Sequence, residues 1–504
     1  MKKNVIAMLL AVVMASGSIG TVPVMAAETT EQESVAVEEA AEEVTVETDE
    51  TNEDASEGES VESVEEVPEQ DLIGSAEESE NETSEDTEII EDTEENDSAD
   101  IADTSAEVAE VEEPAAVVEG VTTEIEGKEA KLAEAGDVVD SGTCGENAIW
   151  TLTGTDDNLT LTISGSGSMS NFTESSIPWA AKRAKIKTVI IEEGITNVGD
   201  YAFYSLNKME SVSIPSTVLS IGESAFRDCI YLHSISIPDG VTEIKVSSFS
   251  GCSSLTSIAI PDNVTRIEAS AFSGCSSLTS ISIPNGVTRI EGGVFSGCSS
   301  LTSITIPDGI TFVGNNAFNG CSSLKSITIP DSVKEIEWSA FYDCSNLTSI
   351  ILPDGISTID SYLFENCSNL TTIRIPDGVT GIGANAFQNC SRLDNIVIPD
   401  GATYISWNAF KGCSSLTSIT IPDSVTSIGT EAFRGCSSLT DITIPDSVIE
   451  LGEDIFWGCE RLESIVLPEG IKKIGTYLFL DCKSLTNVNI PSTVTTIDNS
   501  AFYG

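Results

Sequence analysis

Apolar and polar residues recur in a fixed order along most of the chain. In the copy at 255–277, LTSIAIPDNVTRIEASAFSGCSS, the side chains of Ile258 and Ile260 alternate with those of Ser257 and Ala259. Successive side chains of a strand point to opposite faces, so this pattern predicts a short strand with one buried face. Pro261 cannot donate to a β-ladder, so we expect the strand to end there and the chain to turn. Further apolar residues then return to the interior: Val264, Ile267, Phe272 and Cys275.

The period of this order is 23 residues, and phenylalanine marks it without an insertion. The marker phenylalanines are Phe203, Phe226, Phe249, Phe272, Phe295, Phe318, Phe341, Phe364, Phe387, Phe410, Phe433, Phe456, Phe479 and Phe502. A cysteine follows three residues after the marker in every copy from Cys229 to Cys482. A fixed period in this range is typical of solenoids.

One copy cannot bury its apolar face alone, whereas stacked copies bury a continuous core. We therefore predict a β-rich solenoid over 186–504, with about 14 coils and one parallel strand in each coil. At a strand spacing of about 4.8 Å the stack would be roughly 65 Å long.

The order L-x-x-I-x-I-P-x-x-V-T-x-I-x-x-x-A-F-x-G-C-S-S resembles the BspA-like class of bacterial leucine-rich repeats. The resemblance implies a right-handed leucine-rich-repeat solenoid that is exported to the cell surface or beyond. It also implies adhesion and contact with host proteins, which are roles inferred for some members. The matching residues are core and turn positions, so they indicate a fold and not a ligand.

The first 26 residues have the features of a cleaved signal peptide. Lys2 and Lys3 give a positive start, and the apolar run 5–14 is too short to span a bilayer. Val24-Met25-Ala26 resembles a small-residue cleavage site. We expect a secreted chain, either released or loosely associated with the cell surface, with no membrane insertion after the signal is removed.

Residues 27–140 hold 44 acidic residues against only Lys128 and Lys131. Such composition predicts a disordered acidic linker. The linker is either a solvated spacer or a tail that binds calcium or a partner. The net charge of the whole chain, −59, argues against nucleic acid and anionic membranes as partners.

Between linker and repeats, 141–185 predicts a β-hairpin with strands at 148–152 and 159–164. The first coil of a solenoid would otherwise expose its core, so we expect an N-terminal cap with Trp150 and Trp179 as covering aromatics. A separate binding module is the alternative.

The cysteine column has three interpretations. Stacked side chains that point inward have the wrong mutual orientation for disulfides, which favours buried thiols acting as small hydrophobic residues. Sporadic disulfides and a metal site are the alternatives, and Cys144 lacks an obvious partner.

The sequence contains few of the residue combinations that catalysis requires. His233 is the only histidine, so neither a catalytic triad nor a histidine-ligated metal can be assembled around several such residues. The glycines fall in turns of the repeat rather than in a phosphate-binding loop. We expect no catalysis and no cofactor.

Binding must use positions at which the copies differ. One such surface is the outward strand face, and the other is a group of aromatics beside the marker phenylalanines. The candidate partner-binding residues are Ile351, Arg374, Val397, Trp338, Tyr342, Tyr362 and Trp407. The alternatives are that the strand residues are plain β-formers and that the aromatics pack over neighbouring coils.

The sequence therefore predicts an adhesin-like protein that binds an extracellular protein or glycan, with host matrix as one source of partners. A structural surface spacer without a specific ligand is the alternative. The chain stops two residues after Phe502, so we also expect the last coil to fray after about Leu485 or to associate end to end with another copy.

Overall fold

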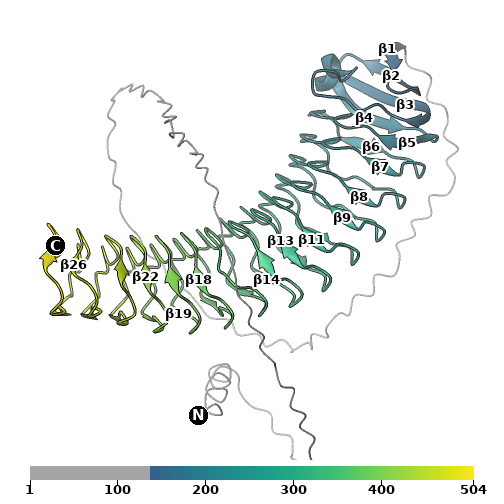
Figure 1. Ribbon diagram of the computed structural model, residues 1–504. Helices are drawn as coiled ribbons and strands as arrows, with labels where there is room; N and C mark the ends of the chain where they lie inside the picture. Colours follow the sequence, from purple (N-terminus) through teal and green to yellow (C-terminus); the bar gives the residue numbers. More distant parts are fainter. Residues whose placement is uncertain (1–136) are drawn as a thin grey trace, which may run out of the picture. The chain divides into compact units, whose positions relative to one another are not determined.

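The computed structural model describes residues 137–504 (Figure 1). The predicted signal peptide, and the predicted linker up to residue 136, lie outside these residues. Among residues 137–504 no helix is long and apolar enough to cross a membrane.

The repeats form a parallel-strand solenoid in which consecutive coils lie side by side (Figure 1). Strands pair in a register of 23 residues, as in the pair Ile281 and Ile304. The strands that precede the Pro turn form what we call the first ladder: β4 (Ile186–Ile191), β6 (Ser211–Ser213), β10 (Ser280–Ser282), β12 (Ser303–Thr305), β14 (Ser326–Thr328), β16 (Ser349–Ile351), β17 (Thr372–Ile373), β19 (Asn395–Val397), β21 (Ser418–Thr420), β23 (Asp441–Thr443), β25 (Ser464–Val466) and β27 (Asn487–Asn489).

A second ladder follows the turn, and here the expectation of one strand per coil is wrong. Its strands are β5 (Ile195–Val198), β7 (Ser220–Ile221), β8 (Glu243–Ile244), β9 (Arg266–Ile267), β11 (Arg289–Ile290), β13 (Phe312–Val313), β15 (Glu335–Ile336), β18 (Gly381–Ile382), β20 (Tyr404–Ile405), β22 (Ser427–Ile428), β24 (Glu450–Leu451), β26 (Lys473–Ile474) and β28 (Thr496–Ile497). Most are two residues long, so they leave no alternation in the sequence. The 23-residue register aligns them all the same, as in the pair Ile290 and Val313.

The marker phenylalanines form a continuous stack in the interior. The rings of Phe226 and Phe249 are 5.6 Å apart and almost parallel, at 4°. The same geometry recurs further along, where Phe410 and Phe433 lie 5.5 Å apart at 2°. This column fixes the spacing of the coils from within.

The cysteines are free and buried, as the favoured interpretation predicts, and the thiols of the repeats also donate hydrogen bonds. The Sγ of Cys252 donates to the carbonyl of Phe226 at 3.2 Å, and the same bond recurs from Cys229 to Cys482. A thiol thus occupies little volume and gives a second donor to a buried carbonyl, which also accepts the backbone N–H of Cys229. Burial raises the pKa of Cys252 to about 12.

The region before the repeats contains three strands: β1 (Val138–Thr143), β2 (Asn147–Thr155) and β3 (Asn158–Ser168). The strands expected at 148–152 and 159–164 lie within β2 and β3, which pair antiparallel. Strand β1 pairs with β2 and starts inside the segment predicted to be disordered up to residue 140, so the structured part begins earlier than expected.

This region contacts the first coil through both backbone and side chains. Strand β3 pairs in parallel with β4, which gives the edge of the first ladder a partner. A 3-10 helix, η1 (Ala180–Lys185), follows Trp179. The indole of Trp179 stacks on Phe203 at 6.0 Å, meets Trp150 edge-on at 5.8 Å, and donates to the carbonyl of Ala202. The aromatic stack of the core thus begins at Trp179.

Candidate binding surfaces

The strand-face candidates lie at equivalent positions of three consecutive coils on the first ladder. Ile351 and Val397 are 64% and 69% exposed although both are large and apolar. The equivalent positions in the flanking coils are Thr328 and Thr420, which pair in register with them. Two apolar side chains therefore stand out between small polar residues, and Val466, further along the same column, is 44% exposed.

Arg374 lies between these two residues in the register. Its guanidinium forms an ion pair with Asp354, in which Nη1 and Oδ1 are 2.6 Å apart. This hydrogen bond raises the pKa of Arg374. The pair is exposed, so it orients the arginine on the surface more than it stabilises the fold.

The four aromatic candidates do not form one cluster. Tyr362 and Trp407 meet edge-on, with ring centroids 6.2 Å apart. Trp338 and Trp407 both stand three residues before their marker phenylalanine and are 48% and 45% exposed. Tyr342 is half-buried, and burial together with the carboxylates of Asp343 and Glu365 raises its pKa. The aromatics thus comprise one contacting pair and two separate residues.

The backbone at Tyr362 is left-handed, with φ of 61°. This conformation is uncommon for a bulky side chain. The equivalent position is left-handed in other coils too, for example at Ser339 and Asn408. The conformation therefore belongs to the turn of the repeat and does not mark Tyr362 as functional.

The second ladder carries a variable column that the sequence analysis missed. It is the sixth residue before the marker phenylalanines from Phe249 to Phe479, and we call it the outer column: Glu243, Arg266, Arg289, Phe312, Glu335, Thr358, Gly381, Tyr404, Ser427, Glu450 and Lys473. Large and charged residues at one register position were the signal that could have revealed it. The column divides into two stretches with different chemistry.

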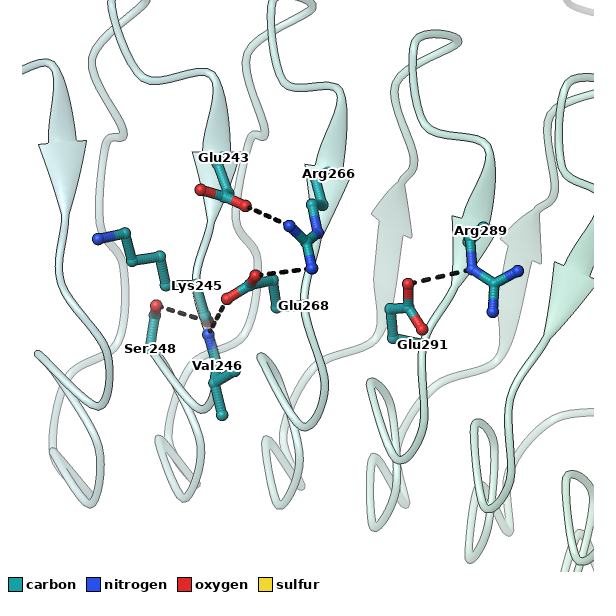
Figure 2. Close-up of polar contacts among 8 residues, drawn as sticks. All are labelled: Glu243, Lys245, Val246, Ser248, Arg266, Glu268, Arg289 and Glu291. Atoms are coloured by element: carbon teal, nitrogen blue, oxygen red, sulfur yellow. Dashed lines mark hydrogen bonds and ion pairs between the residues drawn. The ribbon is translucent and has the colours of Figure 1, made fainter.

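The first stretch, Glu243–Phe312, is closed by contacts within the chain, and we call it the closed stretch. Figure 2 shows Arg266 between two carboxylates, Glu243 of the preceding coil at 3.3 Å and Glu268 of its own coil at 3.0 Å. Glu268 also accepts a hydrogen bond from the backbone N–H of Val246 at 3.0 Å. These contacts tie neighbouring coils together at the surface.

Arg289 continues the closed stretch in the next coil. Its Nε lies 3.2 Å from Glu291 (Figure 2), and its guanidinium carbon lies 3.7 Å from the ring centre of Phe312. The aromatic face of Phe312 is therefore covered by a cation of its own chain. Every large side chain of this stretch has a partner.

The second stretch, Tyr404–Gly452, is hollowed, and we call it the open stretch. A groove of about 690 Å³ runs across its three coils. It is lined by Tyr404–Trp407, Ser427–Thr430 and Ile449–Gly452. Trp407 is therefore the one sequence candidate that borders a groove of the second ladder, while Tyr404 and Glu450 were not anticipated.

We also looked for clusters of side chains that could bind a metal. Residues 137–504 hold no group of three histidine, cysteine or acidic side chains that could bind a metal. His233 is exposed on the surface.

Known proteins resemble this chain at the level of the repeat. A family model for the BspA type leucine rich repeat region, which describes six copies of the repeat, matches residues 180–302, 290–417 and 403–504. The chain belongs to the BspA-type leucine-rich-repeat family. This family is a repeat scaffold, and no enzyme family matches. None of the curated proteins matches this BspA-type chain.

Several solved structures are similar to this BspA-type protein. A leucine-rich repeat protein from Bacteroides ovatus ATCC 8483 is 30% identical, with 70% of this chain and 89% of that chain covered and a TM-score of 0.57. A leucine rich cell surface protein from Faecalibacterium prausnitzii A2-165 is 27% identical, with coverages of 70% and 95% and a TM-score of 0.44. A leucine-rich repeat protein from Eubacterium ventriosum ATCC 27560 is 26% identical, with coverages of 72% and 95% and a TM-score of 0.35.

Proposed function

We propose that this protein acts outside the cell as an adhesin-like binding protein, and that a protein partner docks on the first ladder around Ile351, Arg374 and Val397. Secretion is supported by the charge and length pattern of residues 1–26. The repeat family to which the chain belongs also supports a binding role.

The observation that carries the proposal is the exposure of Ile351 and Val397 on the strand face of the first ladder. Apolar side chains at the centre of an interface contribute most of its binding energy, and arginine is enriched there. The three side chains form such a centre, and the small Ser and Thr residues around them permit close approach of a second surface.

The test compares two double variants of the full chain, one at the proposed centre and one beside it. I351S/V397S removes the apolar side chains, whereas the matched control T328A/T420A alters the same register positions in the flanking coils. The purified chain flows over immobilised solubilised basement-membrane extract and mucin, and binding is measured by surface plasmon resonance. Circular dichroism verifies that both variants are folded.

We expect I351S/V397S to weaken binding at least about tenfold and the control to change it less than about twofold. Equal binding by both variants would place the contact elsewhere and contradict the proposal. Retention of no component by the unmodified chain would favour the alternative, a structural spacer that holds its coils away from the cell surface.

A further inference from the structure

The groove of the open stretch lies on the second ladder and has no role in the function proposed above. We propose that it binds a basic side chain, with arginine preferred over lysine, of a protein partner. The proposal rests on the shape of the groove, the uncovered aromatic faces, the free carboxylate and a comparison with the closed stretch. It does not depend on the first ladder.

Small residues produce the hollow. Four residues before the marker phenylalanine, two coils of the closed stretch carry Glu268 and Glu291, although its last coil has Gly314. Two consecutive coils of the open stretch carry Gly429 and Gly452 there. A Cβ at Gly429 would come within 2.4 Å of the backbone nitrogen of Trp407, so a side chain cannot be added without moving the neighbouring coil. The coils therefore pack closely at this level, and the space above them is left empty.

Two aromatic side chains border this space with exposed surface. Tyr404 is 37% exposed and lies over Gly381, where a Cβ would come 2.2 Å from its ring. Trp407 is 45% exposed and is held on one side by its edge contact with Tyr362. Both rings are thus fixed in place before any ligand arrives, which lowers the entropy lost on binding.

The same protein shows what such rings bind. Phe312 of the outer column is covered by the guanidinium of Arg289 at 3.7 Å, and the Trp457 ring is covered by Arg434 at 3.5 Å. Within residues 137–504, neither Tyr404 nor Trp407 has a cation over its face. The rings of Tyr404 and Trp407 thus lack the arginine that covers the rings of Phe312 and Trp457.

Charge supports a cationic occupant. Glu450 lines the groove and forms no ion pair with another described residue, and no lysine or arginine is among the lining residues. Lys473, the next residue of the outer column, forms its ion pairs with Glu453 and Asp498 and not with Glu450. A positive group entering the groove meets an unpaired carboxylate.

Arginine fits this combination better than lysine. A planar guanidinium stacks on aromatic faces and donates two parallel hydrogen bonds to one carboxylate. A neutral sugar also stacks on tryptophan and its hydroxyls donate hydrogen bonds to carboxylates, but it brings no positive charge to pair with Glu450. Sugar binding is therefore the competing outcome of the test.

The test follows the indole N–H signals of the full chain by NMR during titration with a blocked Gly-Arg-Gly peptide. The readout is local, which separates the groove from unspecific attraction to the acidic N-terminal segment. The variant W407A assigns the signal of Trp407, and the signal of Trp338 serves as the internal control because its exposure and register are similar. Gly-Lys-Gly, Gly-citrulline-Gly and maltotriose are titrated in parallel at 150 mM salt.

We expect the Trp407 signal to shift and saturate with the arginine peptide, to respond more weakly to lysine, and to stay unchanged with citrulline or maltotriose. E450Q should weaken arginine binding about fivefold, the size expected for one exposed ion pair, whereas E335Q, in the same column outside the groove, should leave it unchanged. A Trp407 response to maltotriose in place of arginine, equal responses to arginine and citrulline, or unaltered binding by E450Q would each overturn the proposal.

Discussion

The closed and open stretches of the outer column lie on the same ladder and over the same kind of interior. Below both, marker phenylalanines stack nearly parallel, as in Phe249 with Phe272 at 4° and Phe410 with Phe433 at 2°. Above them the surfaces differ, because Arg266 and Arg289 fill the closed stretch while Gly429 and Gly452 hollow the open one. The repeated residues therefore determine the buried interior of each coil, whereas the outward residues vary and give the two stretches different surface chemistry.

The largest expected effect is in the interior and should be alike under both stretches. F272A and F433A each remove a buried ring from the stack and should lower the free energy of unfolding by about 3–5 kcal/mol. Urea unfolding measures each loss. A much smaller loss of stability for F433A than for F272A would show that the two stretches do not share the same kind of interior, so their surfaces could not be compared on that basis.

The second effect concerns the thiol column under alkaline conditions. Burial raises the folded-state pKa of Cys252 to about 12, above its value in the unfolded chain. Its contribution to stability is therefore complete below about pH 9 and is lost as the pH rises towards 12, at up to about 1.4 kcal/mol per pH unit.

The comparison of C252A and C436A with the unmodified chain tests this effect, because both thiols are buried and their pKa values are raised. Each variant should be less stable at pH 7 and should lose stability less steeply between pH 9 and pH 11. Urea unfolding over this pH range provides the measurement. Unchanged slopes would mean that the thiols titrate normally in the folded chain.

The third effect concerns the ion pairs that occur in the closed stretch and not at Glu450 of the open stretch. R266A removes two ion pairs of the closed stretch and should lower the free energy of unfolding by about 0.5–1 kcal/mol. Because the pairs are exposed, 1 M salt should abolish most of this difference. A salt-independent loss would indicate that Arg266 acts through packing of its stem instead.

The smallest effect on stability is expected at Glu450. E450Q should change the free energy of unfolding by less than about 0.5 kcal/mol, since the carboxylate is exposed and has no ion-pair partner among residues 137–504. Thermal unfolding measures it. A clear stabilisation would show that Glu450 is repelled by neighbouring carboxylates and would weaken its assignment to the groove.

The interior could be predicted from the sequence because apolar residues return to the same positions every 23 residues. Trp407 could be named from the sequence as a candidate because it is a large aromatic residue at a position where the copies differ. The second ladder could not, because its strands of two residues, such as Arg266–Ile267, carry no alternation of their own. The groove was also missed, because it arises from small residues in adjacent coils and from the rings of Tyr404 and Trp407 lying beside them.

The most direct test of the central claim is to close the open stretch from within the chain. S427R places an arginine next to Glu450 in the outer column, as Arg266 lies next to Glu243 in the closed stretch, with the order of the two charges reversed. We expect the S427R variant to be at least as stable as the unmodified chain. We also expect its Trp407 indole signal not to respond to the Gly-Arg-Gly peptide. An unchanged response of Trp407 in a folded S427R chain would contradict the central claim.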